Sequence, residues 1–398
     1  MAQIGTYTTK ETPVRDDKLI GTSSNGGSTN NFLLSAIRQV YYPEDYGAVG
    51  DGAADDTTAL INCASAAGGK IMALQPGKTY IYSGRIILTA NTILNGNHAI
   101  LQRRAGTTLV STTLTAIAEN APSGVTVRVA DPSKFAVNMW VSLDNNVPSM
   151  AEPTFTLAGH KITNISGDVL TLDSAFTTAM GIGSYVRMST TCINAGAGCK
   201  IRNLRIDGNK ANQLIGAAAW GYWGQHYELL VTSSIVEGCE IYNGQSEGIG
   251  MAGIHNVIKN NNIHDCNGNG IHLSASVSDE ITGNRLINNN LLDNNASNLL
   301  TENTGHNEGH ICFSDTTEST VVSGNHIMAT GAYGIGAFDA TNKYIIVNAN
   351  IFDSCVSAPM QIGAGADGVI LTSNFFIDCG VQGTVGGSVI EHNHVINR

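Results

Sequence analysis

One short pattern returns through the second half of the chain and restricts its fold more than any other feature. It consists of an apolar residue, two arbitrary residues, an asparagine, one arbitrary residue and a second apolar residue. Six copies carry the asparagine: Asn261, Asn284, Asn325, Asn350, Asn374 and Asn393. Most neighbouring copies are about 19 to 25 residues apart, which is the spacing of stacked structural repeats. Two earlier copies, 201–206 and 236–241, keep the apolar frame but replace the asparagine with Leu204 and Cys239.

The repeat unit is strand-like rather than helical. Apolar residues alternate with polar ones, β-branched residues dominate, and clusters of Gly, Asn and Asp separate the runs. Such runs can coil into rungs about 4.8 Å apart, so that asparagines of successive rungs form a hydrogen-bonded ladder. Cys266, Cys355 and Cys379 recur three residues after the closing apolar residue and predict a second ladder. We therefore predict an all-β fold, a right-handed single-stranded parallel β-helix.

Composition and charge exclude several classes of partner. The net charge of −11 argues against binding to nucleic acid or to an anionic membrane surface. No segment approaches the roughly 20 apolar residues of a membrane span, and no signal peptide opens the chain. The eight cysteines lack zinc-type spacing, so buried free thiols are expected rather than disulfides. We expect no metal, no cofactor, and synthesis in a reducing cytoplasm.

Residues 1–42 are polar and rich in turn residues, and they precede the repeats. The runs 17–22 and 29–37, which include Leu19-Ile20-Gly21-Thr22 and Asn30-Asn31-Phe32, carry a family resemblance. They are similar to a segment common near the N-termini of bacteriophage tail fibre and tailspike proteins. The resemblance implies that residues 1–42 are an arm that attaches the protein to a phage tail or baseplate protein.

A second motif starts the predicted coil, in residues 43–106. The stretch 45–52 (Asp-Tyr-Gly-Ala-Val-Gly-Asp-Gly), followed by 55–60, resembles the opening motif of the pectate-lyase-like superfamily. Asp55 or Asp56 can accept hydrogen bonds from the free N–H groups at the start of a helix. The helix is predicted over 59–67, and the resemblance implies that it plugs the open end of the coil.

The rung pattern lapses over residues 107–191 and resumes over 192–398, which we assign to the main parallel β-helix. Four runs within the gap read as antiparallel strands: 125–129, 139–143, 160–163 and 169–172. They resemble the small β-domain inserted into the coil of many phage tail proteins. Two further irregularities follow, an aromatic insertion at 220–227 and a long excursion at 288–308.

Candidate site residues emerge when the strands after the asparagine turn are aligned on a central isoleucine. The aligned residues are Ile249, Ile271, Ile311, Ile335 and Ile362. If these point inward, alternation places His272, His310 and Cys312 on the exposed face, where the histidines can contact substrate. Asp315 and Asp339 each follow their isoleucine by four places, about 5 Å apart on successive rungs. When two carboxylates lie that close together, the pKa of one of them rises, so one can act as an acid and the other as a base. The alternative is that the two aspartates cap turns, as Asp often does.

Two further groups of side chains complete the predicted site. Three acidic residues can supply a catalytic partner across the groove: Glu247, Glu302 and Glu308. Four aromatic residues of the insertion can stack on sugar rings: Trp220, Tyr222, Trp223 and Tyr227. Packing in the core or against another subunit is the alternative for these aromatic residues.

The resemblance to pectate-lyase-like tail proteins, which have the pectin-lyase fold, covers nearly the whole chain. It implies a homotrimeric tailspike or tail fibre of the virion that binds and often cleaves bacterial surface polysaccharide (capsule, exopolysaccharide or O-antigen) outside the cell. An uncovered last rung near Val395 would also expose a strand edge, so we expect subunits to cover one another or a trimerisation segment to be missing. Sparse basic residues favour glycoside hydrolysis over β-elimination, which needs a cation beside the uronate. A lyase or C5-epimerase acting on a uronic-acid polymer, and a non-catalytic receptor-binding protein, remain alternatives.

Overall fold

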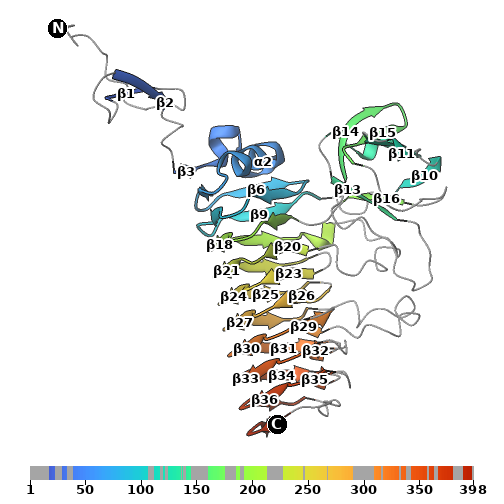
Figure 1. Cartoon of the computed structure of the whole chain (residues 1–398). Coiled ribbons are helices and arrows are strands. Elements are labelled where there is room, and N and C mark those ends of the chain that lie inside the picture. The colour runs from blue at the N-terminus through green and yellow to red at the C-terminus, as the bar shows by residue number, and fades with distance from the viewer. Residues whose placement is uncertain are drawn as a thin grey trace.

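The coil predicted from the repeats is the main body of the molecule (Figure 1). The computed structural model describes residues 18–22, 29–33, 39–105, 112–116, 120–121, 124–135, 137, 140–144, 160–174, 185–188, 192–212, 227–244, 247–266, 268–289, 309–314, 317–330, 333–337, 342–355, 358–362, 366–379 and 389–396. Within these residues, three sheets of parallel strands run along the coil. From β5 to β35, each turn of the chain contributes one strand to each sheet, as a β-helix requires.

The three sheets are named here in the order in which the chain enters them. Sheet I consists of β3 (Val40–Tyr41), β5 (Ile71–Ala73), β8 (Ile93–Asn95), β18 (Lys200–Arg202), β21 (Ile235–Glu237), β24 (Val257–Lys259), β27 (Glu280–Thr282), β30 (Val321–Ser323), β33 (Ile346–Asn348), β36 (Ile370–Thr372) and β38 (Val389–Glu391). Sheet II consists of β4 (Asp51–Asp55), β6 (Thr79–Tyr82), β9 (Ile100–Arg103), β19 (Arg205–Asp207), β22 (Glu240–Tyr242), β25 (Asn262–His264), β28 (Arg285–Ile287), β31 (His326–Thr330), β34 (Ile351–Cys355), β37 (Phe375–Ile377) and β39 (His394–Ile396). Sheet III consists of β7 (Ile86–Leu88), β17 (Ile193–Ala195), β20 (Tyr227–Thr232), β23 (Glu247–Ile254), β26 (Ile271–Val277), β29 (Gly309–Ser314), β32 (Tyr333–Ala337) and β35 (Ala358–Ile362).

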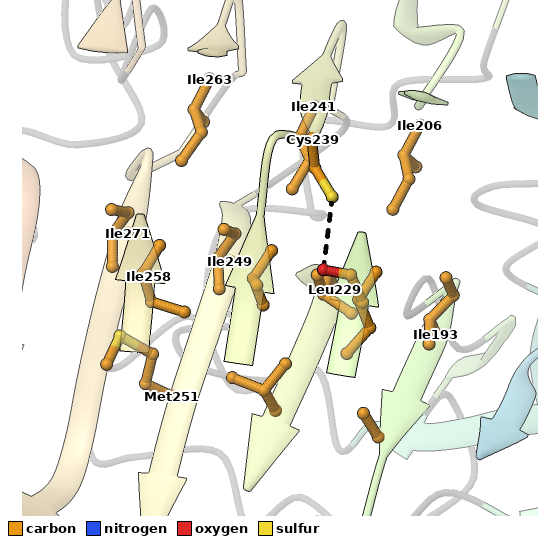
Figure 2. Close-up of a cluster of buried hydrophobic side chains, with 14 of the residues drawn as sticks. Ile193, Ile206, Leu229, Cys239, Ile241, Ile249, Met251, Ile258, Ile263 and Ile271 are labelled. Atoms are coloured by element: carbon orange, nitrogen blue, oxygen red, sulfur yellow. Dashed lines mark hydrogen bonds between the residues drawn. The ribbon is translucent and has the colours of Figure 1, made fainter. Parts of the chain in front are cut away.

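The interior of the coil is filled by apolar side chains from the strands of all three sheets. Figure 2 shows this packing, with Ile258, Ile263 and Ile271 from three successive strands meeting inside the coil. All three are fully buried, and β-branched side chains fit such a pleated surface well. The Cys239 thiol lies among them and points at the Ile201 carbonyl oxygen, 3.8 Å away.

The predicted asparagine ladder is confirmed. It consists of the six repeat asparagines, Asn261 to Asn393, at the turn between sheets I and II. Each side-chain amide nitrogen donates to the amide oxygen of the next asparagine at 3.0 Å. That oxygen also accepts the backbone N–H of the preceding asparagine, as Asn350 Oδ1 does from Asn325 at 2.9 Å. Because buried polar groups must be paired, the ladder fixes the register of the rungs.

The prediction that the cysteines are buried free thiols is also confirmed. All eight cysteines are free, and seven are buried, with Cys379 half-buried. Cys266 also makes a contact like those of the asparagine ladder, since its backbone N–H donates to Asn289 Oδ1 at 3.1 Å.

A mixed polar ladder (Cys199, Ser234, Asn256, Asp279) lies at the turn between sheets III and I. The backbone N–H groups of Cys199, Ser234 and Asn256 donate to Ser234 Oγ, Asn256 Oδ1 and Asp279 Oδ1, at 3.1, 3.0 and 2.8 Å respectively. Asp279 is 2% exposed, and its Oδ2 has no hydrogen-bond partner among the described residues. Burial raises the pKa of the Asp279 carboxyl above its ordinary value.

Asp279→Asn is therefore expected to stabilise the protein at neutral pH by about 1 kcal/mol. The folded state holds a proton on Asp279 more tightly than the unfolded state does, so the wild type loses stability as pH rises above the ordinary Asp pKa. The uncharged amide avoids this loss. Thermal unfolding at neutral and acidic pH measures the gain in stability of Asp279→Asn, with the exposed Asp367→Asn as control. An equal gain at both pH values would contradict the explanation.

The N-terminal end of the coil is covered by helix α2 (Thr57–Ala66), preceded by the short helix η1 (Pro43–Tyr46). Asp55 Oδ1 accepts the backbone N–H of Thr57 at 3.0 Å, which confirms one of the two predicted helix-start contacts. Asp56 instead accepts the backbone N–H groups of Val49 and Gly50 at 2.7 and 3.2 Å. Its carboxylate thus ties the turn of the opening motif to the helix.

The coil begins earlier than predicted. β3 pairs in parallel with β5, so Val40 and Tyr41 form the first strand of sheet I. The predicted start after Pro43 is wrong, because a two-residue strand is too short to show alternation. Upstream, β1 (Lys18–Thr22) and β2 (Thr29–Leu33) pair antiparallel.

Deleting residues 1–38 is expected to leave the thermal unfolding temperature of the coil unchanged, because this deletion spares β3. Deleting residues 1–42 removes β3 and uncovers the edge of β5, so it is expected to lower that temperature. Calorimetry on the two truncations makes the comparison. Equal losses in both would show that the arm stabilises the coil.

The inserted strands form a separate antiparallel sheet beside the coil (Figure 1). They are β10 (Thr112–Ala116), β11 (Asn120–Ala121), β12 (Gly124–Val129), β13 (Trp140–Asp144), β14 (His160–Ser166), β15 (Val169–Leu172) and β16 (Tyr185–Met188), with the short helix η2 (Pro132–Lys134). Pairing of β10 with both β16 and β12 closes the sheet on itself. The four predicted strand segments are confirmed, and their apolar residues form a core of their own.

A buried ion pair joins the rungs on either side of the insertion. Arg103, the last residue of β9, lies 2.7 Å from Glu228 Oε2, and Tyr82 donates to the same oxygen at 3.0 Å. All three residues are at most 3% exposed. Since burying an unpaired charge is costly, these contacts hold the rungs together where the chain leaves and re-enters the coil.

Candidate functional site

Sheet III carries the candidate site, and its register decides which side chains meet. Ile249, Ile271, Ile311 and Ile335 occupy equivalent positions, as predicted. The fifth position belongs to Met360, not Ile362, which instead pairs with Ala337. The prediction failed here because a two-residue shift keeps every side chain on the same face, so alternation cannot detect it.

The residue before each aligned isoleucine faces the interior. A Cβ added at Gly248 would lie 2.8 Å from Ile263 Cγ2, and one added at Gly334 would lie 2.6 Å from Phe352 Cδ1, both in the core. Two successive residues therefore face inward where the chain turns into sheet III. His310 occupies the same column as these glycines and is fully buried, so its predicted exposure is wrong.

His310 thus serves the fold rather than the substrate. Its Nδ1 lies 3.2 Å from Asn289 Nδ2. Burial lowers the pKa of His310 to about 3, so the ring is neutral at physiological pH.

The residue after each aligned isoleucine faces the outer side, since Ile249 and Met251 are both buried in the core around Gly250. His272 and Cys312 lie in this column, but they are only 6% and 5% exposed, so their predicted exposure is also wrong. The His272 ring turns to Glu247, with Nδ1 2.8 Å from Glu247 Oε1. The Nδ1 atom of His272 therefore has its hydrogen-bond partner within the protein rather than in solvent.

Four outer side chains meet at this point, and we call them the sheet III cluster: Tyr227, Glu247, Asn269 and His272. Asn269 Nδ2 donates to Glu247 Oε1 at 3.2 Å. The Tyr227 and His272 ring centroids are 6.1 Å apart. Glu247 accepts through one oxygen from two neighbours, so Nδ1 of a neutral His272 carries the proton and Nε2 is the basic nitrogen.

Gly250 makes room for this arrangement. A Cβ at this position would lie 2.5 Å from two carbons of the Tyr227 ring, so the ring lies directly over the glycine. Gly250 pairs with His272 on the next strand, which brings the two rings together. Gly250 is a positioning residue for the cluster.

Gly250→Ala is expected to push the Tyr227 ring off the sheet and to weaken the binding of a ligand that stacks on that ring by about tenfold, roughly the effect of one lost aromatic contact. In a Tyr227→Ala background the same substitution should change nothing further, because the clash is gone. Titration calorimetry on the four proteins of this cycle measures the coupling. Additive effects would show that Gly250 does not act through Tyr227.

The remaining predicted site residues lie outside the described part of the chain. They are Trp220, Tyr222, Trp223, Glu302, Glu308, Asp315 and Asp339. The strands that precede the two aspartates are described, and Phe313 pairs with Ala337 on the neighbouring rung.

Sequence reasoning missed Asn269 and Gly250. A signal for Asn269 was available, since it lies two residues before Ile271, as Glu247 lies two before Ile249. Aligning that column, beginning with Tyr227 before Leu229, would have grouped three of the four cluster residues.

Two absences among the described residues bear on the class of site. No group of three or more His, Cys, Asp or Glu side chains in them is arranged to hold a metal ion. None of their helices has the length and apolar character needed to cross a membrane.

Several proteins of known sequence or structure are similar to this chain. Depolymerase 1, capsule K30/K69-specific, of Klebsiella phage K5-2 is 26% identical over 251 residues, covering 58% of this chain and 30% of that protein. The chain thus spans less than a third of this relative's length. The catalytic unit of a GH87 alpha-1,3-glucanase from Streptomyces thermodiastaticus superposes with a TM-score of 0.50 at 11% identity, covering 90% of this chain and 53% of that one. Endo-xylogalacturonan hydrolase from Aspergillus tubingensis gives 0.47 at 12% identity, with 90% and 93% covered. At these identities the structural likeness concerns the fold alone.

A family model described as a right-handed beta helix region matches residues 151–304 and 230–376. Together these segments span more than half of the chain, and they include most of the parallel strands of sheets I, II and III. This chain therefore belongs to the right-handed β-helix family.

Proposed function

We propose that this chain binds a bacterial surface polysaccharide on the outer face of sheet III and cleaves it, as part of a phage tailspike. The observation that carries the proposal is the sheet III cluster, where Asn269 and His272 are both hydrogen-bonded to Glu247 beside an aromatic ring. Polar groups beside an aromatic face are what a sugar ring needs. The phage relative named as a capsule-specific depolymerase supports the same substrate class. Fold alone does not, because one fold hosts many functions.

The cleavage proposed is glycoside hydrolysis, with Asp315 and Asp339 as the catalytic carboxylates. The register supports it, because Ile311 pairs with Ile335 and each aspartate follows its isoleucine by four residues. Glu247 lies in the column of Gly309, and β29 ends five residues further on, at Ser314. At roughly 3.3 Å per residue, Glu247 lies about 16 Å along the strand direction from the end of β29, which is farther than the two carboxylates of a glycosidase pair are apart. The cluster is therefore assigned to holding the polymer.

A lyase or C5-epimerase is the second candidate, favoured by one observation. His272 and Tyr227 lie together, and both side-chain types can act as a base that removes a proton from a uronate. Incubation with a panel of purified bacterial polysaccharides separates the reactions. Hydrolysis releases reducing ends without new ultraviolet absorbance, whereas elimination creates an absorbing unsaturated uronate. Intact polymer throughout the panel would leave only receptor binding.

The proposal extends to assembly as a homotrimer whose arm, residues 1–42, attaches it to the virion. The outer face of sheet I supports trimerisation with a column of aliphatic residues, the half-buried Ile235, Val257, Val321 and Ile346 and the exposed Ile370. The exposed Glu280 interrupts this column between Val257 and Val321. Ile351 and Phe375 of sheet II are also exposed, at 38% and 42%. Exposed apolar patches of this kind mark protein interfaces. Light scattering that shows a monomer at micromolar concentration would overturn the trimer.

A further inference from the structure

Two oxygen atoms of the sheet III cluster lack the partners that buried oxygens require. Glu247 Oε2 and Asn269 Oδ1 have no hydrogen-bond donor among the described residues. The two residues are 3% and 0% exposed. The other polar atom of each side chain is used, since Asn269 Nδ2 donates to Glu247 Oε1. Because nearly all buried polar atoms in proteins are paired, two orphans in contacting side chains indicate a built ligand site.

The chemistry of these atoms restricts the ligand. Both are acceptors, so the ligand must bring two donors. The Asn269 amide cannot turn round to offer a donor, because its oxygen would then face the carboxylate of Glu247. A pair of hydroxyl groups on adjacent carbons of a sugar ring supplies two O–H donors.

The charge around the site restricts the ligand further. None of the eight strands of sheet III contains Lys or Arg. A uronate or phosphorylated sugar would place its negative charge beside Glu247 with no cation from these strands to offset it. An uncharged sugar avoids this repulsion.

We propose that Glu247 and Asn269 form a subsite for an uncharged sugar residue, which they bind through two hydroxyl groups. This inference rests on the proposed function, because it names the substrate class at the same site. It predicts that the polymer is neutral at the residue lying on the cluster.

The test is a binding comparison on the full chain. Two sets of bacterial oligosaccharides of matched length, one of neutral hexoses and one rich in hexuronic acid, are titrated by calorimetry. The neutral set is expected to bind at least about tenfold tighter, and Glu247→Gln to weaken that binding about 10- to 100-fold, because the sugar hydroxyl loses its hydrogen bond to a charged acceptor. The exposed Glu280→Gln serves as the matched control and should bind like the wild type.

The outcomes separate this inference from the proposed function. Tight binding and cleavage of the uronate set alone would overturn the inference and leave the depolymerase proposal intact. Binding of neither set would overturn both. If Glu247→Gln fails to fold, wild-type binding at low and high salt still decides: a neutral ligand binds equally at both, whereas a uronate bound against Glu247 binds better at high salt.

Discussion

Asp315→Asn and Asp339→Asn are each expected to lower the turnover of polysaccharide by about 10²- to 10⁴-fold, the usual effect of losing a general acid or base. Binding should remain near that of the wild type, because the sheet III cluster, and not the two aspartates, is assigned to holding the polymer. Glu247→Gln should show the opposite split, with weakened binding. Reducing-end assays combined with calorimetry on the same polymer measure both quantities. The exposed Asp367→Asn is the matched control.

This comparison also tests the rival role of the two aspartates. Should they cap turns, both variants would unfold at a lower temperature, and turnover of the folded fraction would be normal. Should Glu247→Gln lower turnover with binding unchanged, the chemistry belongs to the cluster, and His272 becomes the candidate base.

The second large effect is on stability. Asn350→Ala is expected to lower the free energy of unfolding by roughly 2 to 5 kcal/mol, because it leaves several buried groups without a partner at about 1 to 3 kcal/mol each. The side chain of Asn350 accepts from the backbone and side chain of Asn325 at 2.9 and 3.0 Å, and it donates to Asn374 Oδ1 and to the Val322 carbonyl at 3.0 Å. Polysaccharide binding by the folded protein should not change.

Chemical denaturation measures the effect, with Asn348→Ala as control. Asn348 lies on the same rung, on the outer side of β33, and its Oδ1 has no hydrogen-bond partner among the described residues. Its removal should change the free energy by no more than about 0.5 kcal/mol. Equal losses in both variants would show that the ladder contributes nothing specific.

The architecture was predictable because its determinants recur. An asparagine at a fixed place between two apolar residues identifies the turn, and six repetitions identify the stack. The site was less predictable because it depends on departures from regular alternation. His310 shares a column with Gly248 and Gly270, but only the coordinates show that this column faces inward.

Part of the site could have been found and part could not. Glu247, His272 and Tyr227 were identified by residue type, although His272 was expected on the surface and is buried against Glu247. Gly250 carries no chemistry of its own, and its role is visible only as the space occupied by the Tyr227 ring. Asn269 belongs to a column that the alignment on isoleucine did not consider.

The asparagine ladder also gives the coil a direction. From Asn261 to Asn374, each side-chain amide donates toward the next asparagine along the chain. The amide dipoles therefore add, unlike those of alternating strands, and each bond polarises the one that follows it. A break at Asn325 would divide this column of dipoles into two short pieces, whereas a break at Asn393 would only shorten it. The stability that one ladder asparagine contributes thus depends on how many other ladder asparagines lie on either side of it.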